Sequence, residues 1–171
     1  MQSWDTGVTI NANSDPSVCL TWGFYRNGWE LLDVFRERLE YPELLKAVRR
    51  LQKQWRADKV LIEKASSGIA LLQDLRRENR AVFIARKPKG DKQERMLGQT
   101  GKLEAGGFFI PTSAPWLGAF KHEIEGFPNA KHDDQVDALS QFLNYIGTPR
   151  GMAFTTRNPE TGRPYGKSYL R

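Results

Sequence analysis

The chain has 171 residues, a net charge of +6, 39% hydrophobic residues and 27% charged residues, which is the composition of one globular domain with a substantial core. No apolar run approaches the roughly 20 residues that span a bilayer, and the N-terminus is polar rather than signal-like, so we expect a cytoplasmic protein without membrane association. The single cysteine, Cys19, excludes an internal disulfide and a cysteine-based zinc site.

The first part of the chain predicts strands and then a helix. A weakly alternating strand is expected over residues 6–10. Two β-rich runs over residues 18–25 and 29–35 flank Asn27-Gly28, a dipeptide typical of tight hairpins, so three antiparallel strands in a meander are predicted. Pro42 suits the first turn of a helix in which apolar residues then recur at helical spacing up to Trp55.

The remaining elements alternate between strand and helix. A strand over 59–63, a helix over 68–77 and a strand over 81–85 imply parallel pairing with right-handed crossovers. Further patterns predict helices over 91–105, 114–125 and 133–146 and a short edge strand over 108–111. We therefore expect an α/β domain over residues 1–147. Residues 148–171 are polar, rich in proline and basic, which predicts a flexible tail.

Acidic residues gather at the start of the last predicted helix, where Asp133, Asp134 and Asp137 lie within five positions. Like charges this close repel, whereas a divalent cation needs several anionic oxygens at one point. Asp134 and Asp137 share one face of the helix. Asp5 near the N-terminus and Glu63 at the end of a buried strand are candidates to complete the cluster. A strand with an aspartate, a strand ending in glutamate and a helix opening with aspartate suggest a two-metal nuclease.

Structural explanations exist for some of these residues. Asp5 could be a turn residue, and Asp133 could cap the helix, whose first turn favours acids. These explanations do not cover Asp137, because it lies on a face predicted to be partly covered and its burial without a cation would be costly. His122 and His132 could act as ligands or bases, although their spacing does not single them out.

A basic segment over residues 76–102 holds nine basic residues against three acidic ones. Cations beside an acidic cluster are what an enzyme acting on a polyanion needs. The candidate DNA contacts are Arg86, Lys87, Lys89 and Lys92, and the alternative is a set of solvated helix faces. The chain has no Gly-x-x-x-x-Gly-Lys-Ser/Thr phosphate loop, so we do not expect ATP hydrolysis.

With these residues in place, the chain resembles the C-terminal nuclease domain of the large terminase subunit of tailed double-stranded DNA bacteriophages over residues 3–146. The matching motifs are Ser3-Trp4-Asp5-Thr6, Leu32-Asp33-Val34 with residues 36–42, Leu61-Ile62-Glu63-Lys64-Ala65 to Gly68, Gly90-Asp91-Lys92, Glu104-Ala105-Gly106-Gly107, Ile110-Pro111, Ala114-Pro115-Trp116, Phe127-Pro128-Asn129 and His132 to Leu139. The last motif is specific when it stands with the other two acids.

The resemblance implies an RNase H-like fold, a central mixed sheet flanked by helices with its active site across the first strand, the fourth strand and the last helix. In that site Asp5 matches the first-strand aspartate and Glu63 the second acid. Asp134 is the preferred third acid, Asp137 the fourth ligand, and Asp133 a cap or outer-shell residue. The cofactor implied is a pair of Mg²⁺ or Mn²⁺ ions.

The function implied is that of a metal-dependent endonuclease that cuts concatemeric phage DNA at the start and end of packaging, in the cytoplasm of the bacterial host. Its partners would be double-stranded DNA, an ATPase motor domain, the small terminase subunit and the portal. Without the motor, the chain would be an excised domain or a separately encoded fragment. The alternatives are another RNase H-like enzyme, of the resolvase or ribonuclease H type, and a non-catalytic module that docks on DNA or the capsid.

Overall fold

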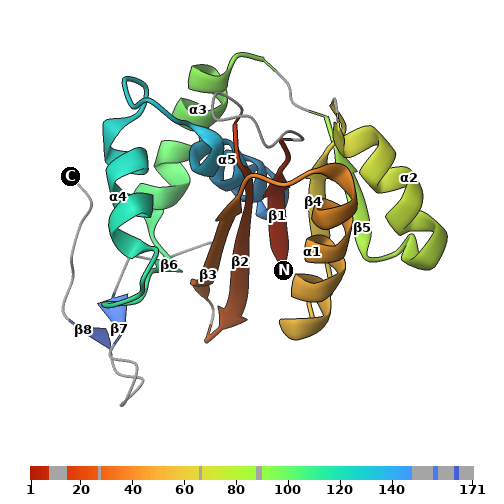
Figure 1. Ribbon diagram of the computed structural model, residues 1–171. Helices are drawn as coiled ribbons and strands as arrows, with labels where there is room; N and C mark the ends of the chain where they lie inside the picture. Colours follow the sequence, from red (N-terminus) through yellow and green to blue (C-terminus); the bar gives the residue numbers. More distant parts are fainter. Residues whose placement is uncertain are drawn as a thin grey trace.

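A computed structural model describes residues 1–7, 15–26, 28–65, 67–87, 90–147, 156–157 and 164–165. Six strands form one mixed sheet in the order β5-β4-β1-β2-β3-β6 (Figure 1). The strands are β1 (Gln2–Asp5), β2 (Ser17–Tyr25), β3 (Gly28–Glu37), β4 (Val60–Glu63), β5 (Phe83–Arg86) and β6 (Phe108–Phe109). The helices are α1 (Tyr41–Gln54), α2 (Ser67–Asn79), α3 (Lys92–Ala105), α4 (Leu117–Gly126) and α5 (Asp134–Ile146).

The sheet combines an antiparallel meander with parallel crossovers, as predicted. Strands β1, β2 and β3 pair antiparallel in sequence order, while β4 pairs parallel with both β1 and β5. Strand β6 is the edge strand and pairs parallel with β3. The sequence therefore predicted the mixed α/β sheet and the positions of its helices.

The first strand lies earlier than the sequence pattern indicated. The prediction of a strand over residues 6–10 was wrong for Thr6 and Gly7, because β1 ends at Asp5. Residues 8–10 lie outside the described residues. Strand β1 gives no alternating signal because its polar residues Gln2 and Ser3 are fully buried. The side chain of Gln2 donates a hydrogen bond to Thr21, so a polar residue is accommodated in the centre of the sheet.

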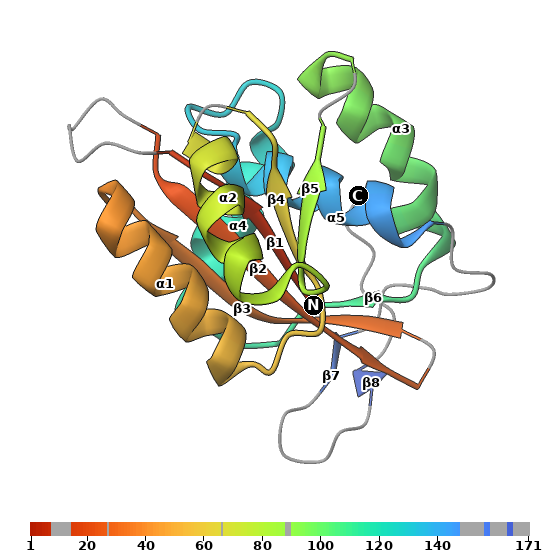
Figure 2. The same cartoon turned by 90° about the vertical axis from the view of Figure 1, so that its right-hand side faces the viewer.

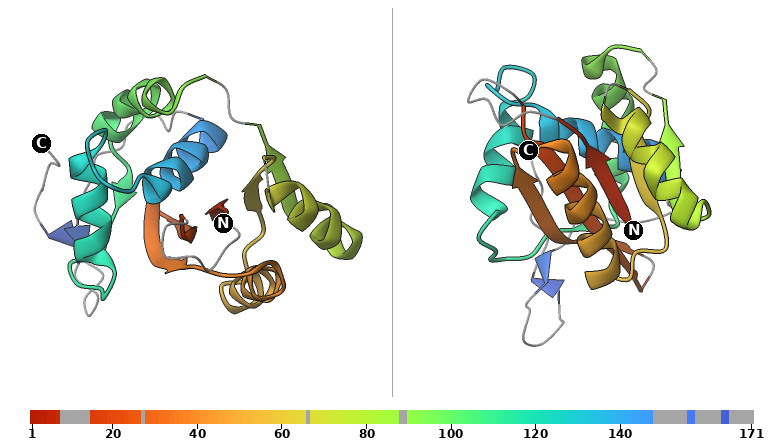
Figure 3. Two further views of the ribbon diagram at one scale, coloured as in Figure 1. Left: turned by 45° about the horizontal axis from the view of Figure 1, so that its top comes forward. Right: turned by 45° about the vertical axis from the view of Figure 1, so that its right-hand side comes forward.

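Alternating residues of the central strands divide the core between the two faces of the sheet. Cys19 packs with Trp4 and with α1 and α2, whereas Val18 and Leu20 pack with α4 and α5. Figure 2 shows α1 and α2 in front of the sheet, and Figure 3 shows the strands between these helices and the layer formed by α4 and α5. Cys19 is fully buried in β2, where it contributes to this packing.

Helix α5 ends at Ile146 and is followed by Gly147, whose φ of 71° is readily adopted by glycine. Beyond it, the described residues form two short strands, β7 (Thr156–Arg157) and β8 (Pro164–Tyr165), which pair antiparallel. The boundary at residue 147 and the flexible tail remain predictions. None of the described helices combines the length and the hydrophobicity needed to cross a bilayer.

Candidate active site

Two of the predicted acids lie at the carboxyl ends of neighbouring parallel strands. Asp5 is the last residue of β1 and Glu63 the last residue of β4. The register pairs Trp4 with Ile62, so the next residue of each strand leaves the sheet at the same edge. Carboxyl ends of parallel strands are where α/β proteins place their ligand sites.

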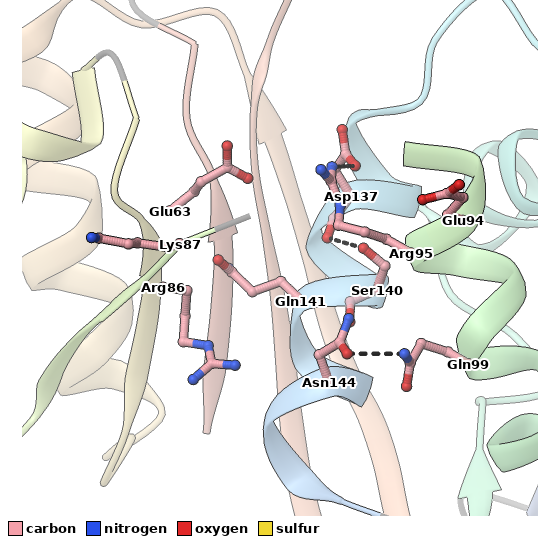
Figure 4. Close-up of a pocket in the computed structure, with 10 residues that line it drawn as sticks. All are labelled: Glu63, Arg86, Lys87, Glu94, Arg95, Gln99, Asp137, Ser140, Gln141 and Asn144. Carbon is pink, nitrogen blue, oxygen red and sulfur yellow. Dashed lines mark hydrogen bonds and ion pairs between the residues drawn. The ribbon is translucent and has the colours of Figure 1, made fainter. Parts of the chain in front are cut away.

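Helix α5 brings Asp137 towards this edge. The side chain of Gln141 donates hydrogen bonds to Ser3 Oγ at 2.9 Å and to the carbonyl oxygen of Trp4 at 3.1 Å, which fixes the helix against β1. Asp137 lies one turn before Gln141 on the same face. Figure 4 shows Glu63 and Asp137 on opposite sides of one cavity, with Gln141 between them.

The electrostatics of Asp5 connect all four acids. Burial raises the pKa of Asp5 to about 8, and the charges of Asp137, Glu63 and Asp134 act in the same direction. Burial also raises the pKa of Glu63, with Asp137 adding to the effect and the nearby Arg95 and Lys92 opposing it. Carboxyls such as Asp5 and Glu63, whose pKa values are raised in this way, fit a hard cation such as Mg²⁺ or Mn²⁺, because the ion supplies the missing positive charge.

Two cations of α3 pair with Asp137. Lys92 Nζ lies 2.7 Å from one carboxylate oxygen and Arg95 Nη2 lies 2.7 Å from the other, and Asp137 is only 8% exposed. Lys92 also bonds Asp133 at 2.8 Å. Although burial acts in the opposite direction, these hydrogen bonds raise the pKa of Lys92. The predicted burial of Asp137 is confirmed. Asp133 occupies the N-cap position of α5, but its side chain makes no capping hydrogen bond.

Asp134 is the most deeply buried of the predicted acids that belong to α5, with 4% of its surface exposed. Burial raises its pKa to about 6, with Asp15 and Glu123 acting in the same direction and Arg36 against them. Its Oδ2 atom lies 3.6 Å from Arg36 and 4.0 Å from His132 Nδ1 and has no hydrogen-bond partner among the described residues.

One group of three acids or histidines among the described residues has candidate ligand atoms that all lie within 4.8 Å of one another, and it consists of Asp15, His132 and Asp134. Asp5, Glu63 and Asp137 are not part of it. Their convergence with Asp134 on two ions is therefore a prediction that requires the side chains to rotate, and Asp137 must also separate from Lys92 and Arg95.

The start of α5 is held by a buried carboxylate that sequence reasoning missed. Glu123 of α4 is 4% exposed and accepts hydrogen bonds from the backbone N–H and the side-chain amide of Gln135, both at 2.6 Å. Arg36 lies 3.6 Å from Glu123 as well as from Asp134. No local pattern indicates these partners, since they come from separate elements; the one hint is a charged residue within an apolar helical stripe.

A cavity of about 660 Å³ runs along α5 beside the acids. It is lined by Glu63, Arg86, Lys87, Glu94, Arg95, Gln99, Asp137, Ser140, Gln141 and Asn144 (Figure 4). Arg86 and Lys87, two of the predicted DNA contacts, therefore share a cavity with two of the predicted metal ligands. Lys92 stands beside it through its bond to Asp137, and Lys89 lies outside the described residues.

Comparison with known proteins identifies the fold. The family model described as the terminase RNase H-like domain matches residues 2–145. The large terminase of a thermophilic bacteriophage is similar in structure, with a TM-score of 0.57 and 17% identity over 85% of this chain and 39% of that chain. The Fowlpox virus resolvase, solved with Holliday junction DNA, has a TM-score of 0.53 and 15% identity over 85% of this chain and 97% of that chain.

The chain thus spans about 39% of the length of the thermophilic bacteriophage terminase. No curated protein sequence matches it significantly. At these identities the two solved structures establish the RNase H-like fold, and the family model establishes the family.

Proposed function

Since residues 2–145 match the family model, the chain belongs to the terminase RNase H-like domain family, and we propose that it is a metal-dependent endonuclease that cuts concatemeric double-stranded phage DNA during genome packaging. The observation that carries this proposal is the position of Asp5 and Glu63 at the same edge of the sheet, beside the first turns of α5. An RNase H-like nuclease needs acids from two strands and a helix at one point, and the two strand ends beside α5 support such a set here.

In this proposal Asp5, Glu63, Asp134 and Asp137 hold two Mg²⁺ or Mn²⁺ ions. Bound ions of this kind lower the pKa of the attacking water and stabilise the leaving 3′ oxygen. The carboxylates bind and orient, and no protein nucleophile is needed. Burial and neighbouring negative charges raise the pKa of Asp5 and of Asp134, so a bound cation favours the release of a proton from each of them.

The cations around the cavity give the DNA-binding part of the proposal. Lys92 and Arg95 neutralise Asp137 without an ion. Once Asp137 binds a cation, both side chains are available to phosphate oxygens beside the cleavage site. Arg86 and Lys87 line the same cavity and extend this positive surface along α5. Such contacts neutralise phosphates without reading bases, so the domain should cut with little sequence preference.

Nicking of supercoiled plasmid DNA tests the proposal. We expect nicking with Mg²⁺ or Mn²⁺, none with EDTA, and none with Glu63→Gln. The matched control is Glu43→Gln, which changes an exposed glutamate on α1. Circular dichroism should show an intact fold for both variants. Binding of DNA without nicking in any divalent metal would refute the nuclease and favour a non-catalytic docking module.

A second candidate is junction resolution, because the Fowlpox virus resolvase has a similar fold over 97% of its length. Cleavage of duplex DNA, a four-way junction and an RNA–DNA hybrid at equal concentration distinguishes the candidates. We expect duplex DNA to be cut at least as fast as the other two substrates. A strong preference for the junction or the hybrid would replace the packaging role with that of a resolvase or a ribonuclease H.

The wider packaging role rests on the family. The ATPase motor, the small terminase subunit and the portal are the partners we propose for the complete machine, in the cytoplasm of the bacterial host. Copurification of the chain with a motor subunit from phage-infected cells is the direct test.

A further inference from the structure

A group of candidate metal ligands surrounds Asp134 and includes neither Asp5 nor Glu63. One ligand atom each from Asp15, His132 and Asp134 lies within 4.8 Å of the other two. Asp15 belongs to the segment that leads into β2, and the other two residues stand at the start of α5. Atoms bonded to one ion at about 2.1 Å are at most about 4.2 Å apart, so a small side-chain movement brings all three into range.

The second observation is a pair of buried polar atoms without hydrogen bonds. Asp134 Oδ2 and His132 Nδ1 both lack a hydrogen-bond partner among the described residues, and the side chain of Asp134 is 5% exposed. They lie 4.0 Å apart, which is too long for a hydrogen bond and close to the separation of two ligands of one ion. Buried polar atoms are usually satisfied, and a shared cation would satisfy both.

The third ligand is held in position by the chain around it. A side chain at Gly7 would collide with the carbonyl oxygen of Asp15, so the two segments can approach this closely only because residue 7 is glycine. Ser17 Oγ donates a hydrogen bond of 2.6 Å to the carbonyl oxygen of Gly7, which ties the same two segments together. These contacts hold the backbone at Asp15 against Gly7, which lies just beyond the end of β1.

Arg36 balances the charge of this group without blocking it. Its guanidinium lies 3.6 Å from both Asp134 Oδ2 and Glu123 Oε2, so it can remain paired with Glu123 when Asp134 binds a cation. A depression of about 270 Å³ provides access from solvent and is lined by Pro16, Arg36, Glu37, Arg38 and His132. Outer partners and an entry path are what a working metal site needs in addition to its ligands.

We propose that Asp15, His132 and Asp134 bind a divalent transition-metal ion through one imidazole nitrogen and two carboxylate oxygens. An imidazole ligand suits ions such as Zn²⁺, whereas Mg²⁺ prefers oxygen ligands, so this site differs in selectivity from the all-carboxylate cluster of the proposed nuclease. Three protein ligands leave a position for water or a phosphate oxygen. The inference rests on the proposed function only in that Asp134 is shared between the two sites.

Nitrogen NMR of the histidine side chains tests the proposal on the unaltered chain. The sequence has two histidines, so the exposed His122 serves as an internal control. Addition of Zn²⁺ to the ¹⁵N-labelled protein should move His132 Nδ1 to the shift of a metal-bound nitrogen and leave His122 unchanged. Roughly millimolar Mg²⁺ should not reverse the change. If Zn²⁺ leaves the nitrogen shifts of His132 unchanged, or changes those of both histidines equally, the proposal is overturned.

Variants measured by calorimetry separate this site from the nuclease. We expect His132→Ala and Asp15→Asn each to lower Zn²⁺ affinity by about tenfold or more, because even the loss of an outer partner commonly costs that much. The controls His122→Ala and Asp58→Asn, both changes of exposed residues, should bind as the unaltered chain does. Equal affinity of the His132→Ala and His122→Ala variants would contradict the assignment.

Asp5→Asn and Glu63→Gln alter the proposed nuclease cluster and leave the three ligands in place, so they should preserve the His132 response to Zn²⁺. If the unaltered chain fails to nick DNA while His132 binds Zn²⁺, the nuclease proposal fails and the metal site stands. If the chain nicks DNA while His132 stays silent, the metal site fails alone.

Discussion

The raised pKa of Asp5 makes the stability of the metal-free protein depend on pH in a defined direction. Asp5 titrates near 3.8 when exposed and near 8 in the fold, so between these values the folded chain holds a proton that the unfolded chain has lost. Stability contributed by the protonated carboxyl is therefore present at low pH and decreases as pH rises through this window. An asparagine at position 5 resembles the protonated acid and removes the contribution of Asp5 to this pH dependence.

The size of the effect follows from the shift. One pH unit within the window corresponds to about 1.4 kcal/mol, so the advantage of Asp5→Asn over the unaltered chain should grow by up to about 3 kcal/mol between about pH 5 and about pH 7.5. Part of the pKa shift of Asp5 comes from neighbouring charges, which can rearrange as Asp5 ionises, so we expect a measured growth of about 1–3 kcal/mol. A stabilising effect of Asp5→Asn would be unusual, because most substitutions of partly buried residues lower the free energy of unfolding.

Urea unfolding in EDTA at the two pH values measures this difference directly, with equal m-values confirming comparable transitions. Asp58→Asn changes an exposed aspartate and should show no such growth. Saturating Mn²⁺ should stabilise the unaltered chain more than the Asp5→Asn variant, since the ion binds the folded state through Asp5. A free-energy difference between Asp5→Asn and the unaltered chain that is the same at both pH values would refute the electrostatic argument.

Three further predictions concern the residues around the cluster. Glu123→Ala should destabilise the protein by about 2–4 kcal/mol, because it leaves buried N–H groups of Gln135 without acceptors, and urea unfolding should show no comparable loss for the exposed Glu125→Ala. Lys92 pairs with Asp137 and so competes with a metal ion for it. Lys92→Met should therefore raise Mn²⁺ affinity, measured by calorimetry, by about tenfold at most, while plasmid nicking slows. Weaker Mn²⁺ binding by this variant would contradict the competition between Lys92 and the metal. Neutralising Arg86, Lys87 and Lys89 together should reduce the slope of log binding constant against log salt concentration by up to about 0.9 per phosphate contact. Deletion of residues 155–171 measures how much of the DNA affinity comes from the tail. Loss of all DNA binding in this deletion variant would refute the role of the cavity.

The fold followed from the sequence wherever apolar periodicity reflects burial. Helix α1, the crossover from β4 through α2 to β5, and the β2–β3 hairpin each carry this signal, and all were predicted within a few residues. Strand β1 was misplaced because Gln2 and Ser3 are buried by hydrogen bonds rather than by apolar contacts. Burial of this kind depends on partners in other elements, and no local pattern records it.

Part of the site was predictable, because a cluster of like charges is unfavourable unless a cation binds to it. The acids at the start of α5 were singled out on that ground, and Asp5 and Glu63 were added as candidates from their positions near the N-terminus and at the end of a buried strand. The structure places Asp5 within electrostatic reach of the other three predicted ligands. The surrounding partners were not predictable. Arg36 reaches Asp134 from a strand far away in the sequence, and Lys92 was assigned to DNA rather than to an ion pair with Asp137, because the sequence gives charges without giving their distances.

The central claim is that four carboxylates converge on a pair of metal ions. Crystals of the chain soaked in Mn²⁺ and measured at the manganese absorption edge test it most directly. We predict two anomalous peaks about 4 Å apart, bounded by Asp5, Glu63, Asp134 and Asp137, with Lys92 and Arg95 separated from Asp137. If saturating Mn²⁺ produces no anomalous peak at this position and Asp137 remains paired with Lys92 and Arg95, the two-metal nuclease is contradicted.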